Sequence, residues 1–171
     1  MVAFRVLVVT MLISLAVVLQ VTLFPYLAYE GVVPNLALLV VVAAALVRGP
    51  EFAAMLGFLA GLAIDLAPPA DHVAGRWALA LVVVGYLAGR VRHDARTSAV
   101  SAIIAVATSS FVATSVFALS GLVLQDPSVP VADTLRVIPV AVIYDVAITP
   151  FVLPLMMRLF RSLESRPQVA Y

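Results

Sequence analysis

The chain has 171 residues, of which 64% are hydrophobic and 11% are charged, and its formal net charge is +1. Soluble domains carry roughly 45–50% apolar and about 25% charged residues, so this composition excludes an ordinary water-soluble domain and predicts an integral membrane protein. The chain has no cysteine, which excludes disulfides, thiolate nucleophiles and metal sites with cysteine ligands.

Six apolar runs follow one another and predict six helices in a single membrane domain over residues 1–171. The runs cover residues 4–24, 32–47, 52–67, 75–89, 98–124 and 134–160. The first run is long and no small-residue cleavage site follows it, so we expect a retained helix rather than a secretory signal. The second, third and fourth runs are short compared with a span of about 20 residues, so we expect their flanks to be partly buried in protein.

The arginines support six crossings and orient them. With six spans, eight of the ten basic residues fall on one side of the membrane, and Arg76 and Arg136 fall on the other. By the positive-inside rule, both termini are then cytoplasmic. A re-entrant hairpin built from the second and third runs is the alternative, but it would carry Arg48 and Glu51 to the bilayer midplane at roughly 2.5–3.5 kcal/mol each. We therefore expect an all-α integral membrane bundle.

Two acidic residues lie inside apolar runs, Asp65 near the end of the third and Asp145 near the middle of the sixth. Such acids usually face the bundle interior and pair with another group, so each marks either a functional or partner-binding site or a polar clamp between helices. Arg76 is the cation that we expect beside Asp65. Asp145 needs a partner from another helix or from carbonyls that Pro150 and Pro154 free, and these prolines predict a kink between Asp145 and Pro154.

Small residues recur at every fourth position in two runs. They are Ala53, Gly57 and Gly61, in a stripe that ends at Asp65, and Gly85 and Gly89 in the next run. Such stripes allow the backbones of two helices to approach closely, and they predict packing within the bundle or, less commonly, contact with a partner helix. We interpret the serines and threonines of the fifth run, Ser110 among them, as hydrogen-bonding packing surfaces.

Several classes of function are disfavoured by what the chain lacks. Without lysine there is no Walker A sequence, so we expect no nucleotide hydrolysis. The two histidines, His72 and His93, fall in loops on opposite sides of the six-span arrangement, so they cannot share a metal. The basic cluster at residues 90–96 fits a cytoplasmic loop beside anionic lipid better than a nucleic-acid site. We expect no enzyme, no cofactor and no metal.

Several short segments carry a family resemblance. They are residues 19–25, 34–36, 48–50, 57–66 and 85–90, with Tyr144-Asp145, Thr149-Pro150, Pro154 and Arg158 near the end. Together they resemble the MreD family, the membrane subunit of the bacterial cell-elongation (rod-shape) system, and the strongest is the Gly-x-x-x-Gly-x-x-x-Asp stripe. The stretch at residues 69–72 differs from the family, in which a glycine-rich turn is common here.

The resemblance implies a scaffold in the bacterial cytoplasmic membrane that binds the bitopic protein MreC. With the actin-like MreB and a glycosyltransferase–transpeptidase pair, this scaffold helps direct lateral peptidoglycan synthesis and cell shape. The resemblance also implies a fold similar to the substrate-binding subunits of energy-coupling-factor transporters. The alternative function is therefore a vitamin-type transport subunit, which predicts an outward-facing pocket lined by aromatic and polar side chains. The external loops offer few such side chains, which favours the scaffold.

Overall fold

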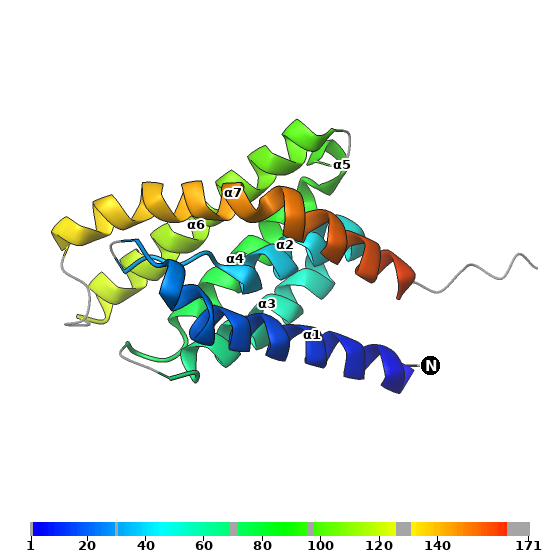
Figure 1. Cartoon of the computed structure of the whole chain (residues 1–171), viewed down its shortest axis with the longest axis horizontal. Coiled ribbons are helices and arrows are strands. Elements are labelled where there is room, and N and C mark those ends of the chain that lie inside the picture. Colours follow the sequence, from blue (N-terminus) through cyan, green and yellow to red (C-terminus); the bar gives the residue numbers. More distant parts are fainter. Residues whose placement is uncertain (1, 30, 69–71, 96–97, 126–130, 164–171) are drawn as a thin grey trace, which may run out of the picture.

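The computed structural model describes residues 2–29, 31–68, 72–95, 98–125 and 131–163, and within these ranges the regular elements are helices (Figure 1). The main helices are α1 (Val2–Thr22), α2 (Leu36–Arg48), α3 (Pro50–Asp65), α4 (Arg76–Arg90), α6 (Ala99–Val123) and α7 (Val131–Ser162), with the one-turn helices η1 (Phe24–Leu27) and α5 (Arg92–Ala95) between them. The prediction of an all-helical fold is confirmed.

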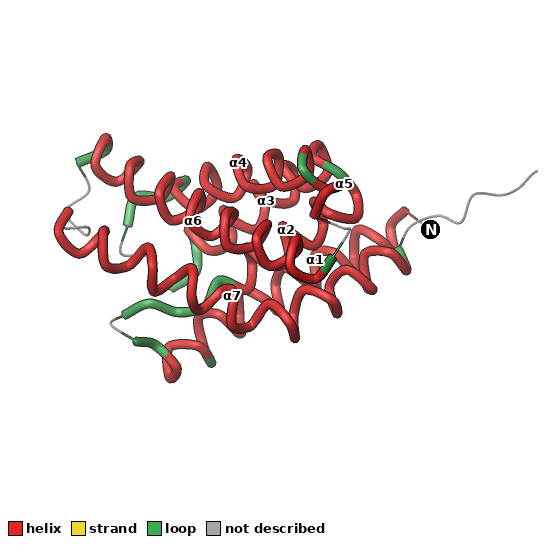
Figure 2. Tube along the Cα trace, turned by 90° about the horizontal axis from the view of Figure 1, so that it is seen from above, coloured by secondary structure: helices red, strands yellow, loops and turns green. Residues whose placement is uncertain are grey.

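Helix α2 lies at the centre of the bundle. All of its residues from Leu36 to Val47 are buried, and it packs against α1, α3, α4, α6 and α7. Figure 2, seen from above, shows these helices gathered around it. A helix that is hydrophobic on every face is stable only where neighbours cover every face, and α2 has only alanine, valine and leucine before Arg48. The hydrophobic core is therefore built around α2.

Some helices are long enough to cross a membrane by themselves, and α2 is not. Three stretches are long and apolar enough to cross a membrane, namely Ala3–Thr22, Ala99–Val123 and Arg136–Ser162. Helix α2 has 13 residues and rises about 20 Å, which is less than the roughly 30 Å of a hydrocarbon core. Because other helices surround α2, protein rather than lipid meets its ends. The lengths of the helices establish three stretches that can cross a membrane, so the total of six crossings stays a prediction.

Proline and glycine set most of the helix boundaries. Helix α2 begins four residues later than we predicted, because Pro34 disfavours helix before it and Asn35 is the N-cap. Pro50 opens α3, the usual place for a proline in a helix. Between α2 and α3, Gly49 has a φ of 95°, a backbone conformation that favours glycine, and it lets the chain reverse without a longer loop.

Helix α7 continues through three prolines, Pro139, Pro150 and Pro154. Both views show it bent in its middle, the orange part of Figure 1. Pro150 cannot donate a backbone hydrogen bond within the helix, and the Thr149 hydroxyl donates to the carbonyl of Asp145 at 2.6 Å. Prolines and back-bonded threonines both bend helices, so the local sequence accounts for this shape.

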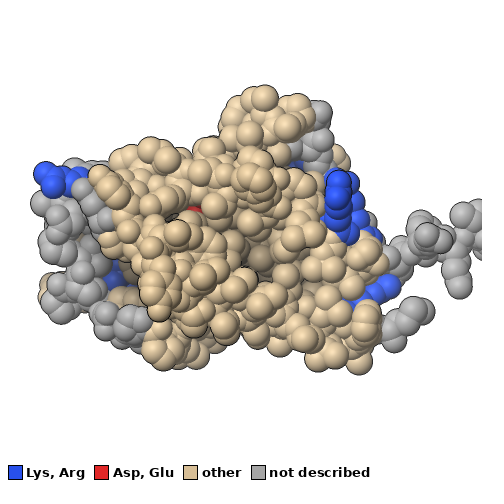
Figure 3. All heavy atoms as spheres, viewed as in Figure 1, with Lys and Arg blue, Asp and Glu red and all other residues tan. Residues whose placement is uncertain are grey.

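The outer surface is largely apolar. Large exposed hydrophobic side chains include Phe4, Leu7 and Met11 on α1 and Phe151 and Leu155 on α7. Figure 3 shows a face that is almost free of charge, with basic side chains gathered at the two ends of its long axis. A soluble protein rarely exposes so much apolar surface, whereas lipid-facing helices do. This pattern fits a bundle whose middle lies in lipid.

Candidate functional sites: two buried acids

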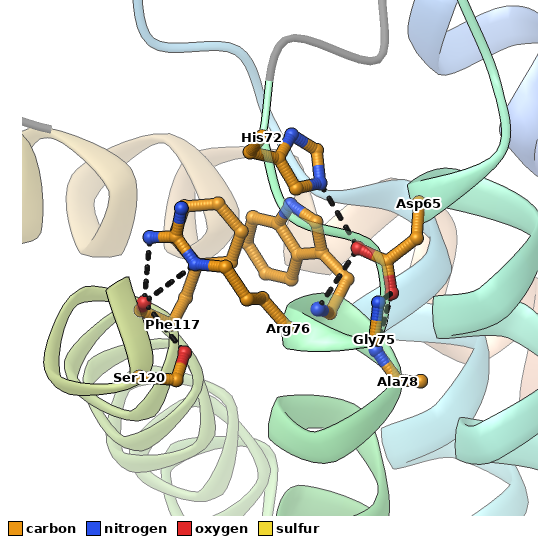
Figure 4. A network of polar contacts seen from close by, with 8 residues as sticks. Asp65, His72, Gly75, Arg76, Ala78, Phe117 and Ser120 are labelled. Carbon is orange, nitrogen blue, oxygen red and sulfur yellow. Dashed lines mark hydrogen bonds and ion pairs between the residues drawn. The ribbon is translucent and has the colours of Figure 1, made fainter. Parts of the chain in front are cut away.

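Asp65, at the end of α3, caps the beginning of α4. Its carboxylate is 1% exposed and accepts backbone hydrogen bonds from Gly75 at 2.9 Å, Trp77 at 3.1 Å and Ala78 at 3.0 Å. His72 Nε2 lies 2.9 Å from the same carboxylate. Figure 4 shows His72, Gly75 and Ala78 turned toward Asp65. The acid thus satisfies three of the four amides that the first turn of any helix leaves without partners.

Two helix dipoles act on this carboxylate with opposite sign. The C-terminus of α3 disfavours a negative charge, whereas the N-terminus of α4 favours one. The amides of α4 point directly at the acid, so α4 outweighs α3. Our prediction that Arg76 is the partner of Asp65 is wrong. Arg76 is the first residue of α4, and its side chain extends away from the capped amides toward α6 (Figure 4).

Arg76 instead binds Phe117 of α6. Its side chain is buried, Nε and Nη2 donate to the Phe117 carbonyl at 3.2 and 2.8 Å, and the guanidinium lies 3.8 Å from the centre of the Phe117 ring. His72 contacts the same ring edge-on at 5.2 Å, and Trp77 stacks on it at 4.6 Å. A side chain larger than a hydrogen at Gly121 would overlap the guanidinium. The Asp65 cluster is thereby attached to α6.

The predicted glycine stripes lie between α3 and α4. A Cβ atom at Gly57 would overlap the carbonyl of Leu81, and one at Gly61 would overlap the backbone of Ala78. From the opposite helix, a Cβ at Gly85 would overlap the backbone of Ala53, and one at Gly89 the backbone of Pro50. The two helices are therefore in backbone contact along their length, and these glycines face the bundle interior.

Asp145 lies in α7, is 1% exposed, and connects α7 to two other helices. One carboxylate oxygen accepts from the backbone N–H of Asn35 at 2.7 Å, and the other accepts from the Ser110 hydroxyl of α6 at 2.6 Å. The partners that we expected from another helix are thus Asn35 and Ser110. Next to the acid, the Tyr144 hydroxyl donates to the Leu27 carbonyl at 3.0 Å, which ties η1 to α7.

The N-terminus of α2 is buried and is capped by side chains from two helices. The Asn35 side-chain oxygen accepts from the N–H of Leu38 at 2.9 Å, and Gln20 of α1 accepts from the N–H of Ala37 at 3.3 Å. Together with Asp145 on the N–H of Asn35, these bonds satisfy amides that lipid could not. The two acids therefore have the same structural role at the first turns of two different helices.

The two acids do not touch, but Trp77 is shared between their surroundings. Its backbone N–H binds Asp65, and the residue also lines a cavity beside Asp145. Pro150 and Pro154 line a separate groove with Arg158 and Arg161 at the far end of α7. Among the described residues, no group of three or more His, Cys, Asp and Glu side chains could hold a metal.

Sequence reasoning did not single out Gln20, Asn35 or Phe117 as site residues. The sequence does point to the first two. Gln20 is an amide inside an apolar run, which indicates a buried polar contact, and Asn35 follows a proline, where Asn is a common helix N-cap. Phe117 carries none, since its ring resembles any other apolar position and its carbonyl belongs to the backbone.

Comparison with known proteins identifies one family. The family model for the rod shape-determining protein MreD matches residues 2–163, nearly the whole chain. No curated protein and no solved structure matches. The match confirms the resemblance seen in the motifs and gives no support to a vitamin-type transport subunit. This chain belongs to the MreD family of rod shape-determining proteins.

Proposed function

We propose that this chain is a non-enzymatic scaffold of the cell-elongation complex, and that it binds a single-span MreC-like protein in the bacterial cytoplasmic membrane. Through that partner, with MreB and the glycosyltransferase–transpeptidase pair, it helps direct lateral peptidoglycan synthesis. Membership of a rod-shape family supports this role. So does the position of both buried acids, which are occupied by helix caps rather than arranged around a shared reaction centre.

The observation that carries the proposal is an apolar groove between α1 and α7. In the part of the chain that is described, the backbones of these two helices stay apart, and α2, which packs against both, forms the floor between them. The groove has a volume of about 350 Å³. It is lined by Leu12, Leu15, Ala16 and Leu19 of α1, Leu36 and Val40 of α2, and Phe151, Val152, Leu155 and Met156 of α7.

The groove suits a helix. Its α1 wall repeats at positions 12, 15, 16 and 19, the spacing that places side chains on one helix face. These positions span about 10 Å along α1, roughly two turns. With almost no polar lining, association here rests on side-chain packing rather than on charge, as is usual between membrane helices. The transmembrane helix of the partner would complete the side of the bundle that α1 and α7 leave open.

In the proposed orientation, six helices cross the membrane and both termini are cytoplasmic. The groove then faces sideways into the lipid, where a single-span helix reaches it by lateral diffusion. The positive-inside pattern of the arginines supports this orientation. The scaffold therefore presents a helix-binding face in the membrane plane.

Cysteine crosslinking tests the docking site cleanly, because the chain has no cysteine. We expect Leu15→Cys and Leu155→Cys, carrying a thiol-linked photocrosslinker in the host membrane, to capture a single-span partner. Met55→Cys on α3 is the matched control, since Met55 is 61% exposed and Leu15 and Leu155 are 57% and 59% exposed. Crosslinking should be several-fold weaker at Met55.

Two outcomes would contradict the proposal. Equal capture from all three positions would remove the groove as the docking site. Purification in mild detergent that recovers an ATPase module or a vitamin in place of a single-span partner would reject the scaffold itself.

A further inference from the structure

A second apolar groove lies between α6 and α7, at the end of the bundle where α6 begins and α7 ends. Figure 1 shows the two helices diverging toward that end. The groove has a volume of about 450 Å³, within the range of about 300–1,000 Å³ that is typical of ligand clefts. It is lined by the first turns of α6 and by one face of α7 from Thr149 to Arg161. That face shares no residue with the groove between α1 and α7, so the two grooves are separate.

The bend in α7 accounts for this groove. The hydrogen bond from Ser110 to Asp145, 2.6 Å long, joins α6 to α7 in the middle of the bundle. Pro150 and Pro154 follow along α7, and prolines bend helices. Both prolines line the groove. The two helices are therefore joined at Asp145, and the groove opens between them beyond Pro150.

The groove is apolar along most of its length and basic at one end. Leu153, Pro154 and Met157 form much of its α7 wall, and the exposed side chains of Arg158 and Arg161 lie at its end. Residues three positions apart on a helix are neighbours, so the two guanidinium groups belong to the same face. The described lining includes no acidic residue. A matching occupant is therefore apolar over most of its length and negatively charged at one end.

The length of the groove matches one leaflet of a bilayer. Thr149 and Arg161 are twelve residues apart, which corresponds to about 18 Å along α7. Half of a hydrocarbon core is about 15 Å thick. Thr149 lies in the middle of the stretch Arg136–Ser162, which is long and apolar enough to cross a membrane. The groove therefore runs from near the bilayer midplane to the level of the lipid headgroups, where its arginines lie.

We infer that this groove binds an anionic phospholipid, with an acyl chain between α6 and α7 and the phosphate on Arg158 and Arg161. The guanidinium group presents paired N–H donors that fit the oxygens of a phosphate. Basic pockets between membrane helices bind anionic headgroups in the same way. The inference rests on α7 crossing the membrane. It does not depend on the groove between α1 and α7 or on a protein partner.

Lipid binding to the full chain is measured by native mass spectrometry in mild detergent. Phosphatidylglycerol is the probe, and phosphatidylcholine with the same acyl chains is the matched zwitterionic lipid. We expect phosphatidylglycerol to bind at least about five-fold more tightly, since each arginine near an anionic headgroup contributes about that factor. Equal affinity for the two lipids would overturn the inference. Glycerol phosphate, which has no acyl chain, should not compete at the same concentration. If it does compete, the ligand is a free phosphate ester and the lipid assignment is wrong.

Arginine variants test the headgroup contact. Arg158→Gln and Arg161→Gln should each weaken the binding of phosphatidylglycerol about five-fold and leave that of phosphatidylcholine nearly unchanged. Arg136→Gln is the matched control, because it removes the same charge from an exposed position toward the other end of α7. If Arg136→Gln weakens binding as much as the two groove variants do, the lipid responds to overall charge and the site is not the groove.

Two further variants test the apolar part of the site. Ala102→Phe places a ring in the groove and should weaken the binding of phosphatidylglycerol by about ten-fold or more, whereas Val100→Phe, at a position of α6 that is 65% exposed and outside the groove, should bind as wild type. Wild-type affinity of Ala102→Phe would overturn the inference. In the host membrane, Ile103→Cys carrying a thiol-linked photocrosslinker should capture a phospholipid. Capture of a protein at this position instead would show that a partner helix occupies the groove.

Discussion

Asp65 and Asp145 are equally buried, yet their surroundings differ in how fully the carboxylate is used. Three amides and His72 surround Asp65, and no unsatisfied side-chain donor lies beside it among the described residues. Asp145 holds two donors, and the Nδ2 of the neighbouring Asn35 has no hydrogen bond among the described residues. Both carboxylates cap a helix. The carboxylate of Asp65 is surrounded by four donors, which we call the closed cap, whereas the carboxylate of Asp145 has two donors and keeps acceptor positions unused.

The difference follows from the elements that meet at each acid. Asp65 joins α3 and α4, neighbours in sequence whose backbones touch at the glycine stripes. Asp145 joins α7 to two residues that are 110 and 35 positions away, Asn35 at the N-terminus of α2 and Ser110 on α6. Helices packed through small residues leave no space, whereas the junction around Asp145 leaves a cavity. We therefore expect the α3–α4 pair to contribute more to stability than the junction around Asp145.

Removing the Asp65 carboxylate should have the largest effect on stability. Asp65→Ala leaves three amides of α4 without acceptors, at about 1–3 kcal/mol each, so we expect a loss of about 3 kcal/mol or more in the free energy of unfolding. Heating the purified protein in detergent and following the folded fraction by size-exclusion chromatography measures this loss. Asp65→Asn retains one acceptor oxygen and should lose markedly less. An unchanged melting temperature for Asp65→Ala would show that the cap is not stabilising.

Adding one methyl group between α3 and α4 tests the closed packing directly. Gly57→Ala forces its Cβ atom into the Leu81 carbonyl, so we expect a cost of about 1–3 kcal/mol. Val100→Ile is the matched control, because it also adds one methyl group, but to a side chain of α6 that is 65% exposed. Melting temperatures of the two variants decide the matter. A cost for Val100→Ile that equals the cost for Gly57→Ala would contradict the backbone contact between α3 and α4.

The sequence was sufficient to predict the helices and the burial of the acids. Apolar runs bounded by Pro34 and Pro50 locate helix ends because proline acts locally, whatever the tertiary fold. The partners of the acids depend on tertiary geometry instead. The amides of Gly75 and Ala78 look like any other amides in the sequence, so Arg76, the nearest opposite charge, was the natural but wrong choice. The enclosure of α2 was only indicated by its short length.

Deleting the Ser110 hydroxyl tests the Asp145 junction, where we expect an intermediate effect. Ser110→Ala removes a 2.6 Å hydrogen bond to the carboxylate, and side-chain hydrogen bonds between membrane helices contribute about 0.6–2 kcal/mol. The neighbouring Ser109 is also buried but has no described bond to Asp145, so Ser109→Ala is the control. We expect the melting temperature to fall for Ser110→Ala and to stay near wild type for Ser109→Ala. If the order is reversed, Ser110 does not hold Asp145.

Replacing His72 should have the smallest effect and separates the two kinds of donor at Asp65. The side chain of His72 is 16% exposed and makes one bond to the carboxylate, so His72→Ala should cost about 0.5–1.5 kcal/mol. The three amides of α4 remain in place, and they keep the acid satisfied without the imidazole. Melting temperatures of His72→Ala and Asp65→Ala, measured side by side, should differ clearly. If they fall equally, the imidazole of His72 rather than the N-terminus of α4 stabilises Asp65.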